Sequence, residues 1–424
     1  MKKQNKRSDL RDFYLLWSTQ SLSQLGSAMT AFALTLWLYD ETGSALGTAA
    51  LTICTYAPYV IMSIFAGAIS DKLDKKKTML VCDALAAAST VAVLLLYQNG
   101  LLRIWHLYLI NALSGLMNTV QQPTSEVAYI RVIPRDYFQK ASGLQSLSRS
   151  LVSIGNPVIA AALYGLAGLD AVIAADLAMF AVAFITLTFF IRIPASDETA
   201  HNKNGVLKLA REGLGYLRKT PVILYVILFM SGVNFISSAF NAVLPAFIIP
   251  GPKGGHGVFG IVSSCSGLAM VAGSLFSTMM PEPKNKVRII YLSMLFSLGT
   301  ENFILAFTKN PIAWCIGQVL GWILVPVMST NQNVLMRDTV PENLLGRVYA
   351  CRNTLQFFTI PIGLAFGGFM VDEICEPLLN NNTTFLNQIF GTGKGSGAAF
   401  MLFILGVMGT AMCLIFGSKL KKYE

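Results

Sequence analysis

Charged residues are scarce in this chain of 424 residues: they make up 13% of it, whereas apolar residues make up 54%. Soluble globular domains carry about 25% charged residues, so this composition excludes an ordinary soluble domain. Only three histidines and seven cysteines are present, without the spacing of metal ligands or of a disulfide framework. A nucleotide-binding P-loop is also lacking, which argues against ATP hydrolysis. We therefore expect no catalytic site, no metal and no cofactor.

Long apolar stretches are what the chain has instead. A membrane-spanning helix needs about 20 predominantly apolar residues. Twelve stretches of the sequence meet this condition: 13–39, 46–70, 78–97, 104–125, 141–168, 171–192, 221–249, 257–280, 287–307, 311–334, 347–371 and 397–417. The sequence therefore predicts an all-α membrane protein with twelve transmembrane helices.

The positive charge is distributed unevenly among the loops. The formal net charge is +10, from 32 lysines and arginines, and most of these lie in loops on the side of both termini. The opposite loops hold only Arg103, Lys253, Lys309 and Lys394. The positive-inside rule then places both termini in the cytoplasm. The charge is thus explained by topology, and we expect no nucleic-acid partner.

The two halves of the chain repeat one another. The segment 126–140 aligns with 333–347, and the same spacing relates the starts of the first and seventh apolar stretches. A parallel repeat of this kind predicts two pseudo-symmetric six-helix bundles with a substrate site between them. We assign the N-terminal bundle to 1–192, a cytoplasmic linker to 193–220 and the C-terminal bundle to 221–424.

Two segments between the apolar stretches receive specific predictions. In 205–219, apolar residues recur at helical spacing opposite basic ones, which is typical of an amphipathic helix on the cytoplasmic membrane surface. The segment 372–397 contains a run of asparagines and threonines and several glycines, so we expect a flexible, solvated outer loop.

The segment 67–77, Gly-Ala-Ile-Ser-Asp-Lys-Leu-Asp-Lys-Lys-Lys, resembles the loop between the second and third helices of major facilitator superfamily transporters. That resemblance implies a conformational latch that joins the two halves when the transporter is open outward. Asp71 would face the positive N-terminus of the eleventh helix. The latch residues would be Gly67, Asp71, Lys72, Arg347 and Arg352. The alternative is a solvated cytoplasmic charge run.

A closer resemblance is carried by 17–26, Trp-Ser-Thr-Gln-Ser-Leu-Ser-Gln-Leu-Gly, by 39–45, Tyr-Asp-Glu-Thr-Gly-Ser-Ala, and by 340–348, Val-Pro-Glu-Asn-Leu-Leu-Gly-Arg-Val. These segments are similar to the macrolide-efflux (Mef-type) branch of bacterial drug–proton antiporters, which also includes siderophore exporters. In addition, Gly155–Ala161 resembles the antiporter motif of the fifth helix.

This resemblance implies a monomeric exporter in the bacterial inner membrane that is not an enzyme. It would move amphipathic, macrolide-like drugs by proton antiport and alternating access. An exporter of an endogenous anion such as a carboxylate siderophore is the alternative. A lipid flippase and a non-transporting receptor stay open as further readings.

Ionisable side chains within apolar stretches are costly in a bilayer and are therefore candidates for function. Asp83, Asp176 and Glu301 fall on helices that stand outside the cavity in this fold, which predicts structural roles for them. Glu126 and Arg149 are left as the proton-coupling pair. Arg149 would either form a structural ion pair with Glu126 or another acid, or bind an anionic substrate.

Amide side chains are plentiful on the helices expected to line the cavity. They supply donors and acceptors without a fixed charge, which suits a large, partly polar solute. The residues predicted to line the cavity are Gln20, Gln24, Asn118, Gln121, Gln122, Asn156, Asn234, Asn241, Asn331, Gln332 and Gln356.

Overall fold

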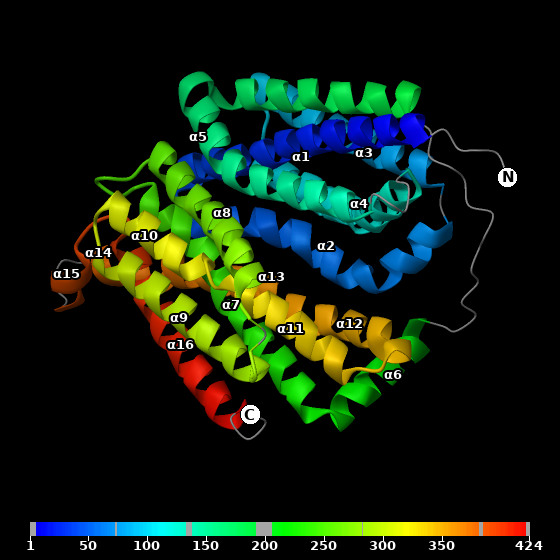
Figure 1. Ribbon diagram of the computed structural model, residues 1–424. Helices are drawn as coiled ribbons and strands as arrows, with labels where there is room; N and C mark the ends of the chain where they lie inside the picture. The colour runs from blue at the N-terminus through cyan, green and yellow to red at the C-terminus, as the bar shows by residue number, and fades with distance from the viewer. Residues whose placement is uncertain are drawn as a thin grey trace. The chain divides into compact units, whose positions relative to one another are not determined.

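The computed structural model describes residues 6–72, 74–132, 138–191, 206–281, 283–380 and 385–420, with the backbone alone at some positions inside helices. These residues form helices and connecting turns, without a strand among them (Figure 1). The long helices are α1 (Lys6–Thr42), α2 (Ala45–Lys72), α3 (Lys75–Gln98), α4 (Ile104–Val132), α5 (Phe138–Ile185), α7 (Pro221–Ile248), α8 (His256–Met279), α9 (Lys286–Phe307) and α16 (Ser396–Leu420). The shorter ones are α6 (Val206–Lys219), α10 (Pro311–Trp322), α11 (Val325–Thr339), α12 (Glu342–Phe357), α13 (Thr359–Phe369), α14 (Glu376–Asn380) and α15 (Phe385–Phe390).

The predicted number of membrane-spanning helices is met. Within the described ranges, nine helical segments are long and apolar enough to cross a membrane. One of them contains both arms of α5, which count separately because the helix is interrupted at Gly168. α1 and α4, 37 and 29 residues long, are not among these nine but are long enough to span, and with them the number of candidates is twelve. The predicted all-α membrane fold is therefore confirmed.

The turn within α5 depends on a glycine. Gly168 has φ +77° and ψ −175°, a conformation that residues with a side chain rarely adopt. No atom lies within 4 Å of the position where a Cβ would stand, so the backbone conformation, not space, requires glycine. The ribbon of α5 doubles back at this point (Figure 1). The break coincides with the predicted boundary between the stretches 141–168 and 171–192.

The chain divides into two compact units. The first comprises Met1–Trp37 and Cys54–Lys203, and the second comprises Leu38–Ile53 and Asn204–Glu424. Both units therefore contain part of α2, since this helix begins in the second unit and ends in the first. The predicted bundles 1–192 and 221–424 did not include this exchange of the segment Leu38–Ile53.

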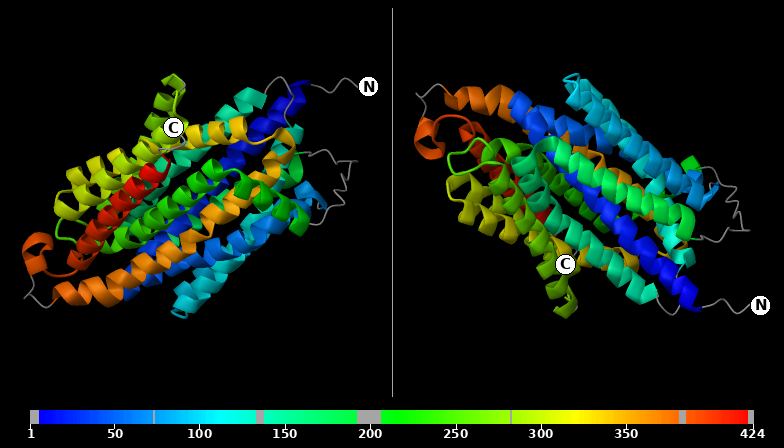
Figure 2. Two further views of the ribbon diagram at one scale, coloured as in Figure 1. Left: turned by 90° about the horizontal axis from the view of Figure 1, so that it is seen from below. Right: turned by 90° about the horizontal axis from the view of Figure 1, so that it is seen from above.

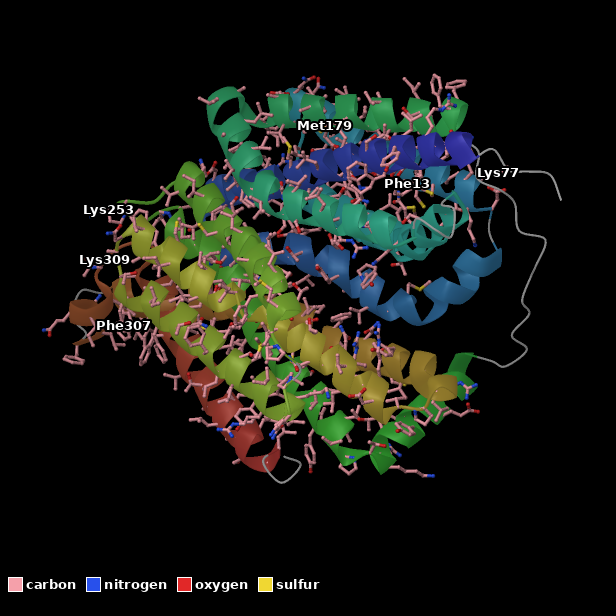
Figure 3. The ribbon with its side chains drawn as sticks, in the orientation of Figure 1. Phe13, Lys77, Met179, Lys253, Phe307 and Lys309 are labelled. Atoms are coloured by element: carbon pink, nitrogen blue, oxygen red, sulfur yellow. The ribbon has the colours of Figure 1, made fainter. Side chains whose placement is uncertain are left out.

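The first unit has an apolar core at one end of its helices. Phe13 of α1, which is labelled in Figure 3, is 2% exposed. Its neighbours come from α1, α3, α4 and the π-helical turn Thr186–Phe190 that follows α5. The fully or nearly buried members are Phe13, Leu16, Met79, Ala128, Leu187 and Ile191.

The second unit is organised around α7, which packs against both α13 and α16; in Figure 2 the green α7 lies between the orange and red helices. Two glycines of α13 allow close approach of the α7 backbone. A Cβ at Gly363 would stand 2.2 Å from the carbonyl oxygen of Phe235, and one at Gly367 would stand 2.5 Å from that of Ala239. Small residues at four-residue spacing are a common basis of helix packing in membranes.

The outer segment after α13 is ordered in its described part, which corrects the expectation of a flexible loop. A π-helical turn, Met370–Cys375, leads into α14 and α15. The ring of Phe390 stacks with Phe307 at 5.8 Å and contacts Phe403 at 5.7 Å; Phe307 is labelled in Figure 3. Aromatic contacts bury enough apolar area to hold such a segment in place, although its composition is polar overall.

The amphipathic helix exists, and part of its apolar face is covered by protein. α6 packs on α12 and α7, and Leu217 is fully buried beside Ile223, Met336 and Val348. Tyr216 Oη donates to the carbonyl oxygen of Thr339 at 2.7 Å. At Leu217 the apolar face therefore contacts neighbouring helices, whereas Leu214 on the same face is exposed; the location of the helix on the membrane surface stays a prediction.

Candidate functional site

A buried carboxyl group joins three helices of the first unit. Asp83 of α3 is 8% exposed. Its Oδ2 accepts from Gln20 Nε2 of α1 at 3.3 Å, and its Oδ1 accepts from Gln121 Nε2 of α4. Among the described residues no basic side chain forms an ion pair with it. Two residues predicted to line the cavity thus converge on a carboxyl that the sequence had assigned a structural role.

A neighbouring side of α4, which faces α2, carries further polar contacts. Thr55 Oγ1 of α2 donates to Asn111 Oδ1 at 3.1 Å, and Tyr59 Oη donates to Gln122 Oε1 at 3.4 Å. A Cβ at Gly115 would stand 2.1 Å from the carbonyl oxygen of Thr55, so α2 and α4 touch at the backbone. The α2–α4 contact is therefore polar along its length.

Two predicted cavity residues of the first unit are exposed rather than buried. The side chains of Gln24 and Asn118 are exposed. Gln24 follows Gln20 by four residues, and Asn118 precedes Gln121 by three, so each shares a helix face with an Asp83 partner. The amide residues around Asp83 thus extend from its buried partners to the exposed Gln24 and Asn118.

A second carboxyl of the first unit is also buried. Asp176 of α5 is 4% exposed and accepts from Thr30 Oγ1 at 2.8 Å and Ser27 Oγ at 3.4 Å, both on α1. A Cβ at Gly26 would stand 2.7 Å from Asp176 Oδ1. This carboxyl therefore joins only two helices, at a close backbone contact.

The predicted proton-coupling pair is only half described. The side chain of Glu126 lies outside the described residues, whereas that of Arg149 on α5 is exposed. The preceding Ser148 is buried and its hydroxyl accepts from Ser21 Oγ at 2.8 Å. The guanidinium of Arg149 thus lies on an accessible face of α5, beside the contact with α1. Asn156, half-buried on the same helix, has an Oδ1 without a hydrogen-bond partner among the described residues.

The amides of the second unit differ in how far they are satisfied. Asn234 Nδ2 donates to the carbonyl oxygen of Gln356 at 2.9 Å, and Asn331 Nδ2 donates to that of Val327 at 2.8 Å. Gln332 and Gln356 are 6% and 5% exposed, and their Nε2 atoms have no hydrogen-bond partner within the described part of the chain. Asn241, by contrast, is exposed.

One unsatisfied glutamine, Gln356, lies next to an interruption of a spanning helix, and Gln332 lies on α11 about two turns beyond another. α10 ends at Trp322 and α12 ends at Phe357. Each of these residues precedes a proline by four positions, Pro326 and Pro361. A proline has no N–H to donate to the carbonyl four residues earlier, so both helices are interrupted there. Broken helices of this kind form substrate sites in transporters.

The third buried carboxyl lies beside the first of these interruptions. Glu301 of α9 is 6% exposed, and its Oε1 accepts from Trp322 Nε1 at 3.0 Å. Ser297 Oγ donates to the carbonyl oxygen of Gly321. Gly321 itself leaves no room for a side chain, since its Cβ would stand 2.5 Å from Glu301. Two polar side chains of α9, Ser297 and Glu301, thus form hydrogen bonds with Gly321 and Trp322 at the end of α10.

The two arginines predicted for the latch have described partners within the second unit. Arg347 forms an ion pair with Glu212 of α6. Arg352 donates to Asn333 Oδ1 at 3.0 Å and to Asn353 Oδ1 at 2.9 Å, and its guanidinium lies 4.4 Å from the ring centre of Tyr349. The side chains of Asp71 and Lys72, like the surroundings of Gly67, lie outside the described residues.

The model of the Major Facilitator Superfamily matches residues 16–364. The chain belongs to the major facilitator superfamily. Macrolide efflux protein A of Streptococcus pyogenes is 23% identical over 367 residues, which cover 85% of this chain and 90% of that protein. The multidrug efflux pump Tap of Mycolicibacterium fortuitum is 21% identical over 359 residues, with 82% and 86% covered.

Solved structures of the major facilitator fold resemble this one. The nucleoside transporter NupG, solved as a point mutant, has a TM-score of 0.74 at 12% identity and covers 96% of this chain and 99% of its own. A bacterial homologue of the iron transporter ferroportin has a TM-score of 0.69 at 13% identity, with 97% and 99% covered. This superfamily member is therefore a multi-pass membrane transporter for a small molecule, not an enzyme.

Proposed function

We propose that the protein is a secondary active exporter that moves amphipathic compounds of the macrolide type out of the cell in exchange for protons, by alternating access. It would work as a monomer in the bacterial inner membrane, with both termini in the cytoplasm. Relatives named for macrolide efflux and multidrug efflux support the direction and the substrate class.

The observation that carries this proposal is the pair of buried glutamines in the second unit. Each has an Nε2 donor without a partner among the described residues, and Gln356 lies next to the end of α12. A buried donor without a partner costs about 1–3 kcal/mol, which a bound carbonyl, ether or hydroxyl oxygen would recover. Macrolides present many such oxygens on an apolar ring and few charges, so neutral amides fit them better than fixed ions do.

Binding and transport of erythromycin by the purified protein in liposomes test this function. We expect a proton gradient across the liposome membrane to drive erythromycin transport by wild type, in the direction opposite to proton flow. Gln332→Met and Gln356→Met should weaken erythromycin binding. The matched control is Gln318→Met, since Gln318 is 1% exposed and also has an unpaired Nε2 but is not a predicted cavity residue. Equal erythromycin affinity in all four proteins would contradict the amide site.

Glu126 is our candidate for the principal proton-exchanging group, with Arg149 beside it. Glu126→Gln should abolish transport driven by the pH gradient while erythromycin still binds. If the arginine forms a structural ion pair, Arg149→Ala should lower thermal stability by only about 0–1 kcal/mol, because Arg149 is exposed. Full gradient-driven transport by the glutamine variant would remove Glu126 from the mechanism.

A second candidate function, export of a carboxylate anion, is favoured by the arginines. The described hydrogen bonds of Arg352 go only to amide oxygens, and Arg149 is exposed, so both could take a carboxylate. A bidentate carboxylate needs the planar guanidinium fork. Citrate should then raise the thermal stability of wild type but not that of Arg149→Lys or Arg352→Lys, whereas stabilisation by erythromycin alone favours the macrolide.

The latch of Gly67, Asp71 and Lys72 belongs to the same proposal. In the outward-open state Asp71 would take Arg347 or Arg352 as its partner, so it would compete with Glu212 for Arg347. Asp71→Asn should shift the population toward the inward-open state. Cysteines introduced at the cytoplasmic ends of α2 and α12 should then react faster with a water-soluble maleimide, and unchanged reactivity would count against the latch.

A further inference from the structure

We propose that Asp83 carries a transported proton and that its two glutamine partners, Gln20 and Gln121, position it for this task. The inference rests on the proposed proton antiport and adds a second proton site to it. The buried carboxyl groups of this protein differ in the kind of partner they have, and that difference separates Asp83 from most of them.

Fixed donors on both oxygens of a carboxyl oppose its protonation. Asp372 accepts from the backbone amide of Ala45 at Oδ1 and from that of Leu46 at Oδ2. A protonated Asp372 would have to place its own O–H against one of these donors. Glu301 accepts at Oε1 alone, from the indole of Trp322, so its contact joins α9 and α10 and not three helices.

Glutamine partners serve both forms of the carboxyl. An amide presents N–H₂ on one side and C=O on the other, and a half-turn about its last bond exchanges the two. Gln20 and Gln121 donate to Asp83 as described. After protonation of Asp83, one of them can turn and accept the new O–H, so the carboxyl keeps a hydrogen bond at each oxygen in both states. Among the described residues no cation fixes the charge of this aspartate.

A proton also needs a way to Asp83. Gln24 and Asn118 are exposed and share helix faces with Gln20 and Gln121 respectively. Gln121 itself is only half-buried. The proposed route for the proton therefore runs along these amides, from the exposed Gln24 and Asn118 to the partners of Asp83.

The position of Asp83 also links its proton to helix arrangement. Its carboxyl contacts α1 and α4 from α3, so a change of protonation alters contacts among three helices. Coupling requires an element whose two states are biased by the ligand and by the proton. Asp176, the other carboxyl with reversible partners, contacts hydroxyls of α1 only and lies against Gly26. It is therefore the matched control.

The decisive measurement is proton release when erythromycin binds to the purified protein, followed by a pH indicator dye in weakly buffered detergent solution. We expect Asp83→Asn to release fewer protons than wild type and to lose transport driven by a pH gradient, while exchange of labelled for unlabelled erythromycin without a gradient continues. Asp176→Asn should behave as wild type in all three assays. Unchanged proton release by Asp83→Asn, or its loss only in Asp176→Asn, would overturn the assignment.

Two further results keep the outcomes separate. If Asp83→Asn does not purify as a folded protein, Gln121→Met removes one partner and keeps the carboxyl; we expect it to shift the pH at which transport is half-maximal, and an unchanged pH profile counts against the assignment. Wild type that transports erythromycin without any dependence on the pH gradient would contradict the proposed antiport itself, and Asp83 with it.

Discussion

Asp372 accepts a hydrogen bond from the backbone amide of Leu46 at 2.9 Å, across more than three hundred residues of sequence. The same carboxylate accepts from the amide of Ala45 at 3.0 Å and from Ser44 Oγ at 2.6 Å. The amides of Ala45 and Leu46 belong to the first turn of α2, where backbone N–H groups have no partner within the helix. A side chain of the C-terminal half of the chain thus caps a helix that begins in the N-terminal half.

Removal of this cap should destabilise the protein. The loss of a side-chain cap costs about 0.5–2 kcal/mol, so Asp372→Ala should lower the free energy of unfolding by that amount, and Asp372→Asn by less because an acceptor is kept. Thermal unfolding in detergent measures the change. The control is Glu373→Ala, which removes an exposed charge from the next position; an equal loss in both variants would mean that charge, not capping, matters.

Close packing of α13 on α7 gives a second prediction. Gly367→Ala would bring a methyl group to 2.5 Å from the carbonyl oxygen of Ala239, so the helices must separate. We expect a loss of about 1–3 kcal/mol. Gly165→Ala is the control, because Gly165 is exposed on α5 with no atom within 4 Å of its Cβ position. It should be neutral or slightly stabilising.

The attachment of α6 should depend on its buried leucine more than on its ion pair. Leu217 is fully buried, and truncation of such a leucine to alanine costs about 2–5 kcal/mol. The side chains of the Glu212–Arg347 pair are 38% and 33% exposed, and exposed pairs contribute about 0–1 kcal/mol. Leu217→Ala should therefore speed proteolysis of the segment before α7 far more than Glu212→Gln. The reverse order would show that the ion pair holds the helix.

The indole N–H of Trp322 should contribute to the stability of the protein through its hydrogen bond to Glu301. Trp322→Phe keeps an aromatic ring but leaves Glu301 Oε1 without its described donor. A buried polar group that loses its partner costs about 1–3 kcal/mol. Unfolding of this variant should be compared with that of Trp105→Phe, since Trp105 is 60% exposed and its replacement should change little. Equal stabilities would make the Glu301 contact unimportant.

How far the sequence predicts this molecule depends on the kind of feature. The apolar stretches identify all twelve spanning helices, and the gap between 168 and 171 coincides with the turn at Gly168. The interruptions after Trp322 and Phe357 were missed, because hydropathy continues through them. The signals were present in Pro326 and Pro361, each four residues later, but prolines are common in membrane helices.

The sequence predicts which kinds of residue form the candidate site, but not which side chains form hydrogen bonds with one another. Amide residues were expected in the cavity, and the structure joins two of them, Gln20 and Gln121, to Asp83. Periodicity gives the face on which a residue lies, but not which helices pack together, so Asp83 was assigned to a peripheral helix. Caps such as Asp372 on α2 escape prediction for the same reason, since they depend on contacts far apart in sequence.

The division of α2 between the two units has a consequence for how this helix can move. The units meet in sequence between Ile53 and Cys54, and Pro58, inside the helix, cannot donate to the carbonyl of Cys54. The helix therefore lacks a backbone hydrogen bond at the boundary between its two parts, which belong to different units. Asp372 holds the first turn of α2 in place. The helix can therefore bend near Cys54 without breaking a further backbone hydrogen bond.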